Sequence, residues 1–194
     1  MRNLKSIVLV SLITVSSIMV TGCASIVGQT TNDPILSSPG LRTAGTVFDD
    51  ELIESKILIN LSKANAQVNQ SHINVISFNE SVLLVGQVPS QQASDDAEAI
   101  ATQTRKVKKV HNELQIAGPT SFVIRSNDTY LTSRVKVALL TSESANALRI
   151  KVITENATVY LMGLVTRDEA QAAVDEIVKI GGVIRIVKVF EYID

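Results

Sequence analysis

The chain of 194 residues contains 18 basic and 19 acidic side chains, which give it a formal net charge of −1 at pH 7. This balance excludes a general polyanion binder such as a DNA-binding protein, because proteins of that class are basic. The single cysteine excludes a disulfide within one chain. The absence of tryptophan and the low aromatic content of 4% predict a largely aliphatic core.

The first 22 residues have the pattern of an export signal. Arg2 and Lys5 precede an uncharged run over residues 7–20. As a helix this run would extend about 21 Å, which is short of the ~30 Å hydrocarbon core of a bilayer. The segment therefore fits a cleaved signal peptide, residues 1–22, better than a membrane-spanning helix.

The signal ends at Cys23, and the residues before it, Val20-Thr21-Gly22, resemble the lipobox of bacterial lipoproteins. The resemblance implies that Cys23 becomes the mature N-terminus and is the lipid-attachment residue, carrying diacylglycerol and an acyl chain such as palmitate. The alternative is a plain secreted protein with a chance cysteine. Ala24 stands where Asp would favour the inner membrane, so the resemblance implies an outer-membrane anchor. The domains are expected in the periplasm, with surface exposure as the alternative.

Residues 23–46 lack hydrophobic periodicity and are rich in Gly, Pro, Ser, Thr and Asn, which predicts a flexible tether. Loss of Arg2 and Lys5 with the signal leaves 16 basic and 19 acidic residues, a net charge of −3.

The rest of the chain contains one unit twice. Residues 79–88 match residues 156–165 at an offset of 77, and each match is preceded by a helix pattern. The first copy is predicted as a helix over 50–62, strands over 73–78 and 82–85, a helix over 90–106 and a strand over 110–116. The second is predicted as a helix over 128–142, strands over 150–154 and 158–161, a helix over 166–179 and a strand over 184–192.

Several local signals support these elements. Ile53, Ile57 and Leu61 recur at helical spacing, as do their counterparts in the second copy, and Asp50 and Asp128 are predicted to cap the helix starts. Thr166 and Glu169 form a predicted capping box. Gly86 and Gly163 are predicted to end the second strand at the same place in each copy, where backbone freedom or close approach of backbone would require glycine.

The αββαβ order and the segment over residues 152–166 resemble the BON domain, a small module of bacterial envelope proteins. The resemblance implies an α+β fold of two tandem BON domains, residues 47–117 and 122–194, each with a three-stranded mixed sheet packed against two helices. Ala157 departs from the pattern, because a glycine is usual after the asparagine, and it leaves the turn type open. A lipobox followed by two such domains resembles the outer-membrane lipoproteins of this family.

The sequence offers no catalytic residues, no metal site and no cofactor motif, so we expect a protein that is not an enzyme. His72 and His111 are the only histidines, and with no cysteine to spare they cannot form a common zinc site. No phosphate-binding glycine loop or nucleophile elbow is present.

The first helix of the second copy is the candidate membrane contact. Outside its core face it carries an apolar and basic strip, which suits lipid headgroups: Tyr130, Arg134, Val137, Leu140 and Thr141. The corresponding helix of the first copy is acidic, which predicts that the second copy alone reads lipid.

The resemblance implies binding of anionic phospholipid through this helix, with roles in outer-membrane integrity and localisation to the division site. Two alternatives remain open. The strip could pack against the first domain, or the protein could be an adaptor for envelope proteins with incidental lipid contact. A general chaperone and a hydrolase are weaker alternatives. We expect a monomer with no nucleic-acid partner.

Overall fold

The computed structural model describes residues 40–194, so the predicted signal peptide, Cys23 and the tether up to residue 39 lie outside the described part. The first copy is built from α3 (Ala44–Ser62), α4 (Ala66–Asn69), β1 (His72–Phe78), β2 (Ser81–Val88), α5 (Gln91–Thr102) and β3 (Lys109–Ile116). The second is built from α6 (Phe122–Thr141), the 3-10 helix η2 (Ala147–Arg149), β4 (Ile150–Glu155), β5 (Thr158–Val165), α7 (Arg167–Ile177) and β6 (Arg185–Tyr192).

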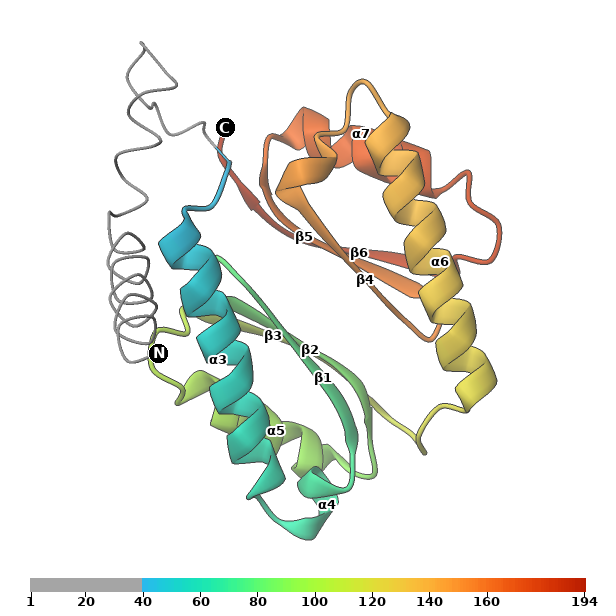
Figure 1. The fold of residues 1–194 in the computed structure, drawn as a ribbon. Helices are drawn as coiled ribbons and strands as arrows, with labels where there is room; N and C mark the ends of the chain where they lie inside the picture. Colours follow the sequence, from blue (N-terminus) through green and yellow to red (C-terminus); the bar gives the residue numbers. More distant parts are fainter. Residues whose placement is uncertain (1–39) are drawn as a thin grey trace, which may run out of the picture. The chain divides into compact units, whose positions relative to one another are not determined.

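Each copy contains one three-stranded mixed sheet (Figure 1). In the first, β2 is central, antiparallel to β1 and parallel to β3. In the second, β5 is central, antiparallel to β4 and parallel to β6. Two mixed sheets with helices confirm the predicted α+β class.

The helices pack on their sheets through the faces that the periodicity predicts. Ile53, Ile57 and Leu61 of α3 enter one buried cluster with Val82 and Leu84 of β2. In the second copy, α6 contributes Leu131, Val135 and Leu139 to the equivalent cluster. The predicted capping box also forms, because Thr166 and Glu169 each accept the other's backbone amide at 3.2 and 2.9 Å.

Both first helices begin six residues earlier than predicted. Their N-caps are Thr43 and Ser121, not Asp50 and Asp128, and α3 takes up the last residues of the predicted tether from Ala44 onward. These first turns carry no core-facing residues, so hydrophobic periodicity gives no sign of them.

Asp50 and Asp128 instead hold the hairpin turns. The buried Asp50 carboxylate accepts the amides of Asn79 and Glu80 at 2.9 and 2.8 Å, the Ser77 hydroxyl at 2.7 Å and Arg42 at 2.6 Å. Burial, the largest influence, disfavours its charged form, but these four donors outweigh burial and hold the pKa of the carboxyl below its ordinary value.

Asp128 repeats the arrangement in the second copy, where it accepts the amides of Asn156 and Ala157 at 2.9 and 2.8 Å. Both residues of each turn have positive φ, 48° and 56° at Asn156 and Ala157. A two-residue hairpin with both residues left-handed is a type I′ turn. The turn type that Ala157 left open is therefore the ordinary one, formed without glycine.

Gly86 and Gly163 lie inside the central strands, two residues before their ends, rather than at the ends. A Cβ on Gly86 would lie 1.9 Å from the His72 carbonyl oxygen, and one on Gly163 would lie 2.4 Å from that of Arg149. The predicted close approach of backbone is confirmed at both positions.

The two sheets pack against each other through their helix-free faces. A third apolar cluster joins residues of β1 and β2 to residues of β5 and β6: Ile76, Phe78, Leu83, Val85, Tyr160, Met162 and Val189. Glu155 is buried beside it and accepts from Asn74 at 3.0 Å and Gln87 at 2.7 Å. Lys151 pairs with Glu54 at 2.9 Å. Both copies therefore belong to one compact unit.

Candidate membrane-binding surface

The α6 strip, defined as Tyr130, Val137 and Leu140, lies on the side of α6 away from its core. Leu131, Val135 and Leu139 fill the core face and are almost fully buried. At 100° per residue the strip lies on the opposite half of the helix. Tyr130 and Val137 are each 60% exposed and Leu140 is 65% exposed, so all three apolar members face solvent.

Arg134 and Thr141, the polar members of the predicted site, are also exposed. The Arg134 guanidinium lies 5.8 Å from the centre of the Tyr130 ring and donates to the Gly181 carbonyl at 3.3 Å. One guanidinium nitrogen thus donates within the protein. The Thr141 hydroxyl donates back to the carbonyls of Val137 and Ala138. The Thr141 hydroxyl is therefore already used within the helix and is less available to a ligand than its position suggested.

The exposed charge of α6 is entirely positive. Arg125, Arg134 and Lys136 are exposed, whereas Asp128, the one acid of the helix, is buried under the hairpin turn. Among residues 40–194 none of these three cations forms a salt bridge. The helix thus presents apolar side chains flanked by free positive charge.

The exposed surface is larger than the predicted strip. Phe122 and Val123, in the first turn that the sequence did not reveal, are 77% and 75% exposed, and Leu148 of η2 is 82% exposed. A small hollow of about 210 Å³ adjoins Leu140, and Lys136 and Ala147 are among the residues that line it. The available local signal for the N-terminal extension was Ser121, a preferred N-cap residue type directly before Phe122.

The alternative that the strip packs against the first domain is wrong for this structure. The copies contact each other through the sheet cluster around Leu83 and Tyr160 and through the ion pair of Lys151 with Glu54 of α3, and α6 contributes nothing to that cluster. The strip is left without a protein partner in the described part of the chain.

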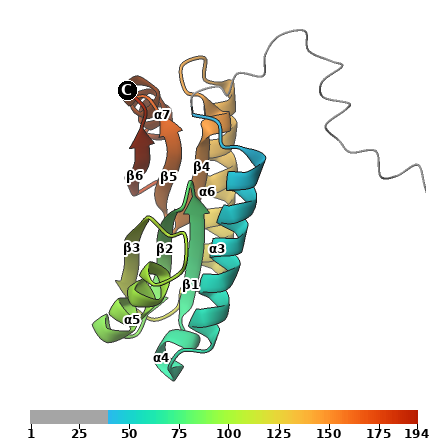
Figure 2. The same ribbon diagram turned by 90° about the vertical axis from the view of Figure 1, so that its left-hand side faces the viewer.

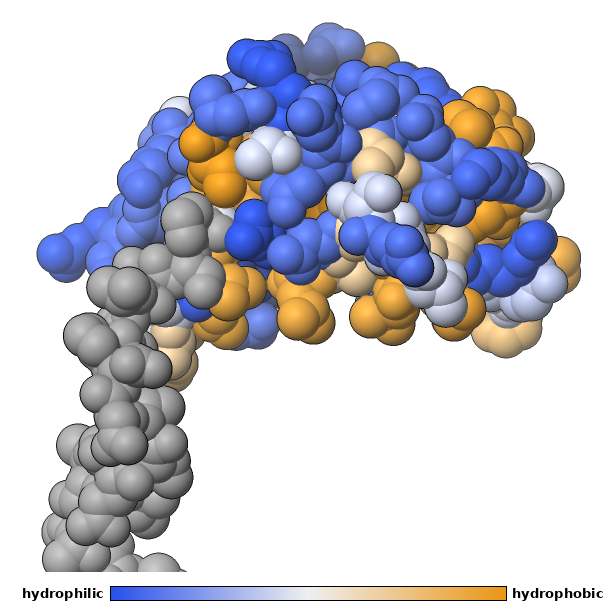
Figure 3. Space-filling view, turned by 90° about the horizontal axis from the view of Figure 1, so that it is seen from above, coloured by the Kyte–Doolittle hydropathy of each residue, from blue (hydrophilic) through white to orange (hydrophobic). Residues whose placement is uncertain are grey.

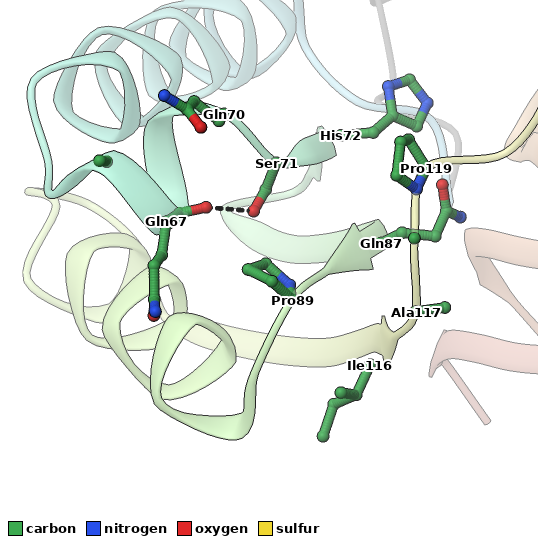
Figure 4. Close-up of a pocket in the computed structure, with 11 residues that line it drawn as sticks. Gln67, Gln70, Ser71, His72, Gln87, Pro89, Ile116, Ala117 and Pro119 are labelled. Carbon is green, nitrogen blue, oxygen red and sulfur yellow. Dashed lines mark hydrogen bonds between the residues drawn. The ribbon is translucent and has the colours of Figure 1, made fainter.

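A second candidate is a cavity of about 630 Å³ at the end of the first domain (Figure 4). It lies beside the linker between the copies and is lined by Ala66, Gln67, Gln70, Ser71, His72, Gln87, Pro89, Ile116, Ala117, Gly118 and Pro119. Its lining carries no Asp, Glu, Lys or Arg, and Gln87 already donates to Glu155 and accepts from the Thr120 amide. The cavity offers no converging charge or acid–base pair.

The histidines do not form a site together with other ligands. His72 lines the cavity, whereas His111 lies in β3, where burial and then Lys109 lower its pKa. Within residues 40–194 no group of three or more His, Cys, Asp or Glu side chains is placed to hold a metal ion. Nor is any helix in that range long and apolar enough to cross a bilayer.

The described part of the chain is thus a tandem of two αββαβ modules that are joined sheet to sheet and have exposed helix faces. The BON domain model matches the chain twice, over residues 49–118 and 127–194. The chain belongs to the BON-domain family.

Three curated proteins extend the comparison. The chain is 38% identical over 182 residues to the outer membrane lipoprotein DolP of Haemophilus influenzae, covering 92% of this chain and 93% of that protein. It is 35% identical to the 21 kDa hemolysin of Actinobacillus pleuropneumoniae, covering 78% of each. Osmotically-inducible protein Y of Escherichia coli K12 is 23% identical over 180 residues, 92% of this chain and 88% of that protein. The chain is thus a dual-BON protein similar to DolP, located at the outer membrane and held there by lipid.

Proposed function

We propose that this protein is a non-enzymatic lipoprotein, acylated on Cys23 and facing the periplasm, whose α6 binds anionic phospholipid. Through this binding it supports outer-membrane integrity and localisation to the division site. The observation that carries the proposal is the outer face of α6, which combines the exposed apolar strip with three cations and no exposed acid.

This combination suits the boundary between lipid headgroups and acyl chains. Val137 and Leu140 can enter the apolar layer, and the phenol of Tyr130 suits the headgroup level. Arg125, Arg134 and Lys136 then lie at the depth of the phosphates. Each basic residue near an anionic membrane surface contributes about 1 kcal/mol.

The anchor and the helix would have different tasks. Acylation of Cys23 with more than one chain suffices for stable attachment. Binding through α6 would add only a few kcal/mol, and that part depends on the charge of the lipid. The helix would therefore direct the anchored protein to regions of the membrane rich in anionic phospholipid.

Co-sedimentation with vesicles tests the proposal, using the mature chain with Cys23→Ser so that the anchor does not mask the helix. We expect binding to vesicles of phosphatidylglycerol and phosphatidylcholine, and little to phosphatidylcholine alone. Leu140→Glu should abolish the difference. Val178→Glu is the matched control, because Val178 is also 65% exposed but follows α7, which lies on the other side of the molecule (Figure 2).

Equal binding to both vesicle types would contradict the proposal, as would equal effects of Leu140→Glu and Val178→Glu. The adaptor function makes a different prediction. It requires one dominant protein partner in crosslinking experiments that remains bound to Leu140→Glu and Tyr130→Ser variants.

A further inference from the structure

The outer face of α3 carries an apolar stripe that no part of the described chain covers. The α3 stripe, defined as Phe48, Leu52 and Ile59, follows the spacing i, i+4, i+11 and therefore forms one line along the helix. Its members are 64%, 38% and 51% exposed. Core residues such as Ile57 lie on the opposite side of the helix. Phe48 alone exposes a large aromatic surface that costs free energy in water.

The acidic character of α3, from which the sequence predicted repulsion by anionic lipid, is largely neutralised. Asp50 is buried with Arg42, Asp49 pairs with Lys106 at 2.7 Å, and Glu54 pairs with Lys151 at 2.9 Å. Glu51 is the one acid of the helix without a salt bridge among residues 40–194.

The two first helices lie on the same side of the compact unit. In Figure 2, α3 and α6 both lie at one side and α5 and α7 at the other, while Figure 1 shows the two sheets between α3 and α6. The space-filling view shows apolar side chains gathered in a row along the corresponding lower edge (Figure 3). A flat surface applied to this side would meet both helices at once.

The position of the anchor in the chain points to the same surface. Only 20 residues separate Cys23 from Ala44, where α3 begins. At full extension a chain of 20 residues reaches only about 70 Å. The first helix of the described chain is thus the element tied most closely to the acylated end.

We propose that the α3 stripe is a second membrane-contacting surface, which enters the bilayer to which Cys23 is anchored while α6 contacts the same bilayer. Both copies, and not the second alone, then contact the membrane, each through its first helix. Glu51 and Lys56 are the two exposed charges of α3 without a salt bridge among residues 40–194, and they have opposite sign. The helix α3 therefore contributes insertion without charge selectivity, and α6 contributes the preference for anionic lipid. The inference that both helices contact the same bilayer rests on the proposed function of α6.

Single-probe depth measurements test this arrangement on the acylated chain in vesicles of phosphatidylglycerol and phosphatidylcholine. Because Cys23 is the only native cysteine and acylation consumes its thiol, one introduced cysteine can be labelled alone. A polarity-sensitive probe is placed at Ile59→Cys on α3, at Val137→Cys on α6 and at Ala99→Cys on α5. All three positions are exposed, so these substitutions leave the cores intact. Brominated phosphatidylcholine serves as the quencher.

We expect quenching at positions 59 and 137 to exceed that at position 99 by about fivefold or more, as for side chains buried at the acyl boundary. Quenching at 137 but not at 59 would overturn the inference and leave the proposed function intact. Quenching at 59 but not at 137 would support the α3 contact and overturn the role of α6. Quenching at neither position would overturn both.

A second copy of the chain is the competing occupant of the α3 stripe. A dimer through this stripe predicts that the probes at Ile59→Cys of two molecules quench each other, and that this quenching is the same with and without vesicles. Sedimentation of the mature Cys23→Ser chain distinguishes the two cases. A monomer whose vesicle binding falls about fivefold on Phe48→Ser supports membrane contact. The fivefold figure corresponds to about 1 kcal/mol for one partly inserted aromatic side chain. A dimer that Phe48→Ser dissociates would refute it.

Discussion

Replacement of Asp50 by Asn should destabilise the protein more than replacement of Asp128, although the two occupy equivalent positions. The Asp50 carboxylate accepts from two turn amides, one hydroxyl and Arg42, whereas Asp128 accepts from two amides. An asparagine retains one carbonyl acceptor, and its amide nitrogen then faces donors. Arg42 also loses its partner, and it remains stacked over the Phe78 ring at 3.9 Å.

Hydrogen bonds to charged groups contribute about 1.5–3 kcal/mol each, and an unsatisfied buried donor costs about 1–3 kcal/mol. With two of four bonds lost, we expect Asp50→Asn to lower the free energy of unfolding by about 3–4 kcal/mol. With one of two bonds lost, Asp128→Asn should lower it by about 2 kcal/mol. Urea unfolding followed by far-ultraviolet circular dichroism measures both.

The lowered pKa of Asp50 adds a dependence on pH. Because its folded-state pKa lies below the ordinary value of 3.8, its stabilisation is fully present above that value. It is lost as the pH falls through the folded-state pKa. The Asp50→Asn variant should lack this part of the acid sensitivity. Equal losses for the two substitutions, or an unchanged acid profile in Asp50→Asn, would refute the assignment of Asp50 as the stronger hub.

Three further predictions concern the turns, the central strands and the contact between the sheets. Ala157→Gly should stabilise the protein by about 1 kcal/mol in urea unfolding, because alanine is strained at φ 56°; a loss of stability would contradict the turn assignment. Gly86→Ala should destabilise it by more than about 2 kcal/mol, because the new Cβ would collide with the His72 carbonyl; a melting temperature within error of the parent would disprove this contact. Glu155→Ala removes the acceptor of Asn74 and Gln87 and should speed proteolysis of the linker at residues 118–121, with an unchanged cleavage rate as the contrary result.

The duplicated order of helices and strands could be predicted from sequence because it depends on local signals. Helical spacing of Ile53, Ile57 and Leu61, the capping box at Thr166, and short β-branched runs all act within a few residues. The helix starts could not be predicted from hydrophobic spacing, because the residues of the extra turns face solvent. The role of Asp50 depended on a turn about 30 residues further along the chain, so a local capping interpretation was the only one open.

The candidate surface was predictable only in part, for the same reason. Exposure of Tyr130, Val137 and Leu140 followed from the position of the core face on α6. The acids of α3 looked repulsive because their partners lie far away, 57 residues for Asp49 and 97 for Glu54. The sheet-to-sheet contact did have a signal, since residues 82–85 and 159–162 are uninterrupted apolar runs, as expected of strands buried on both faces.

The cluster between the sheets joins corresponding positions of the two copies. Leu83 and Tyr160 are both members, as are Val85 and Met162, and each pair is separated by the repeat offset of 77. Such a patch is complementary to itself, which is how the subunits of a two-fold dimer meet. Fusion in one chain makes this association intramolecular, so it does not depend on protein concentration. Either copy alone would expose an apolar sheet face. In the tandem, each copy covers the sheet face of the other, so the helices are not needed to cover these faces.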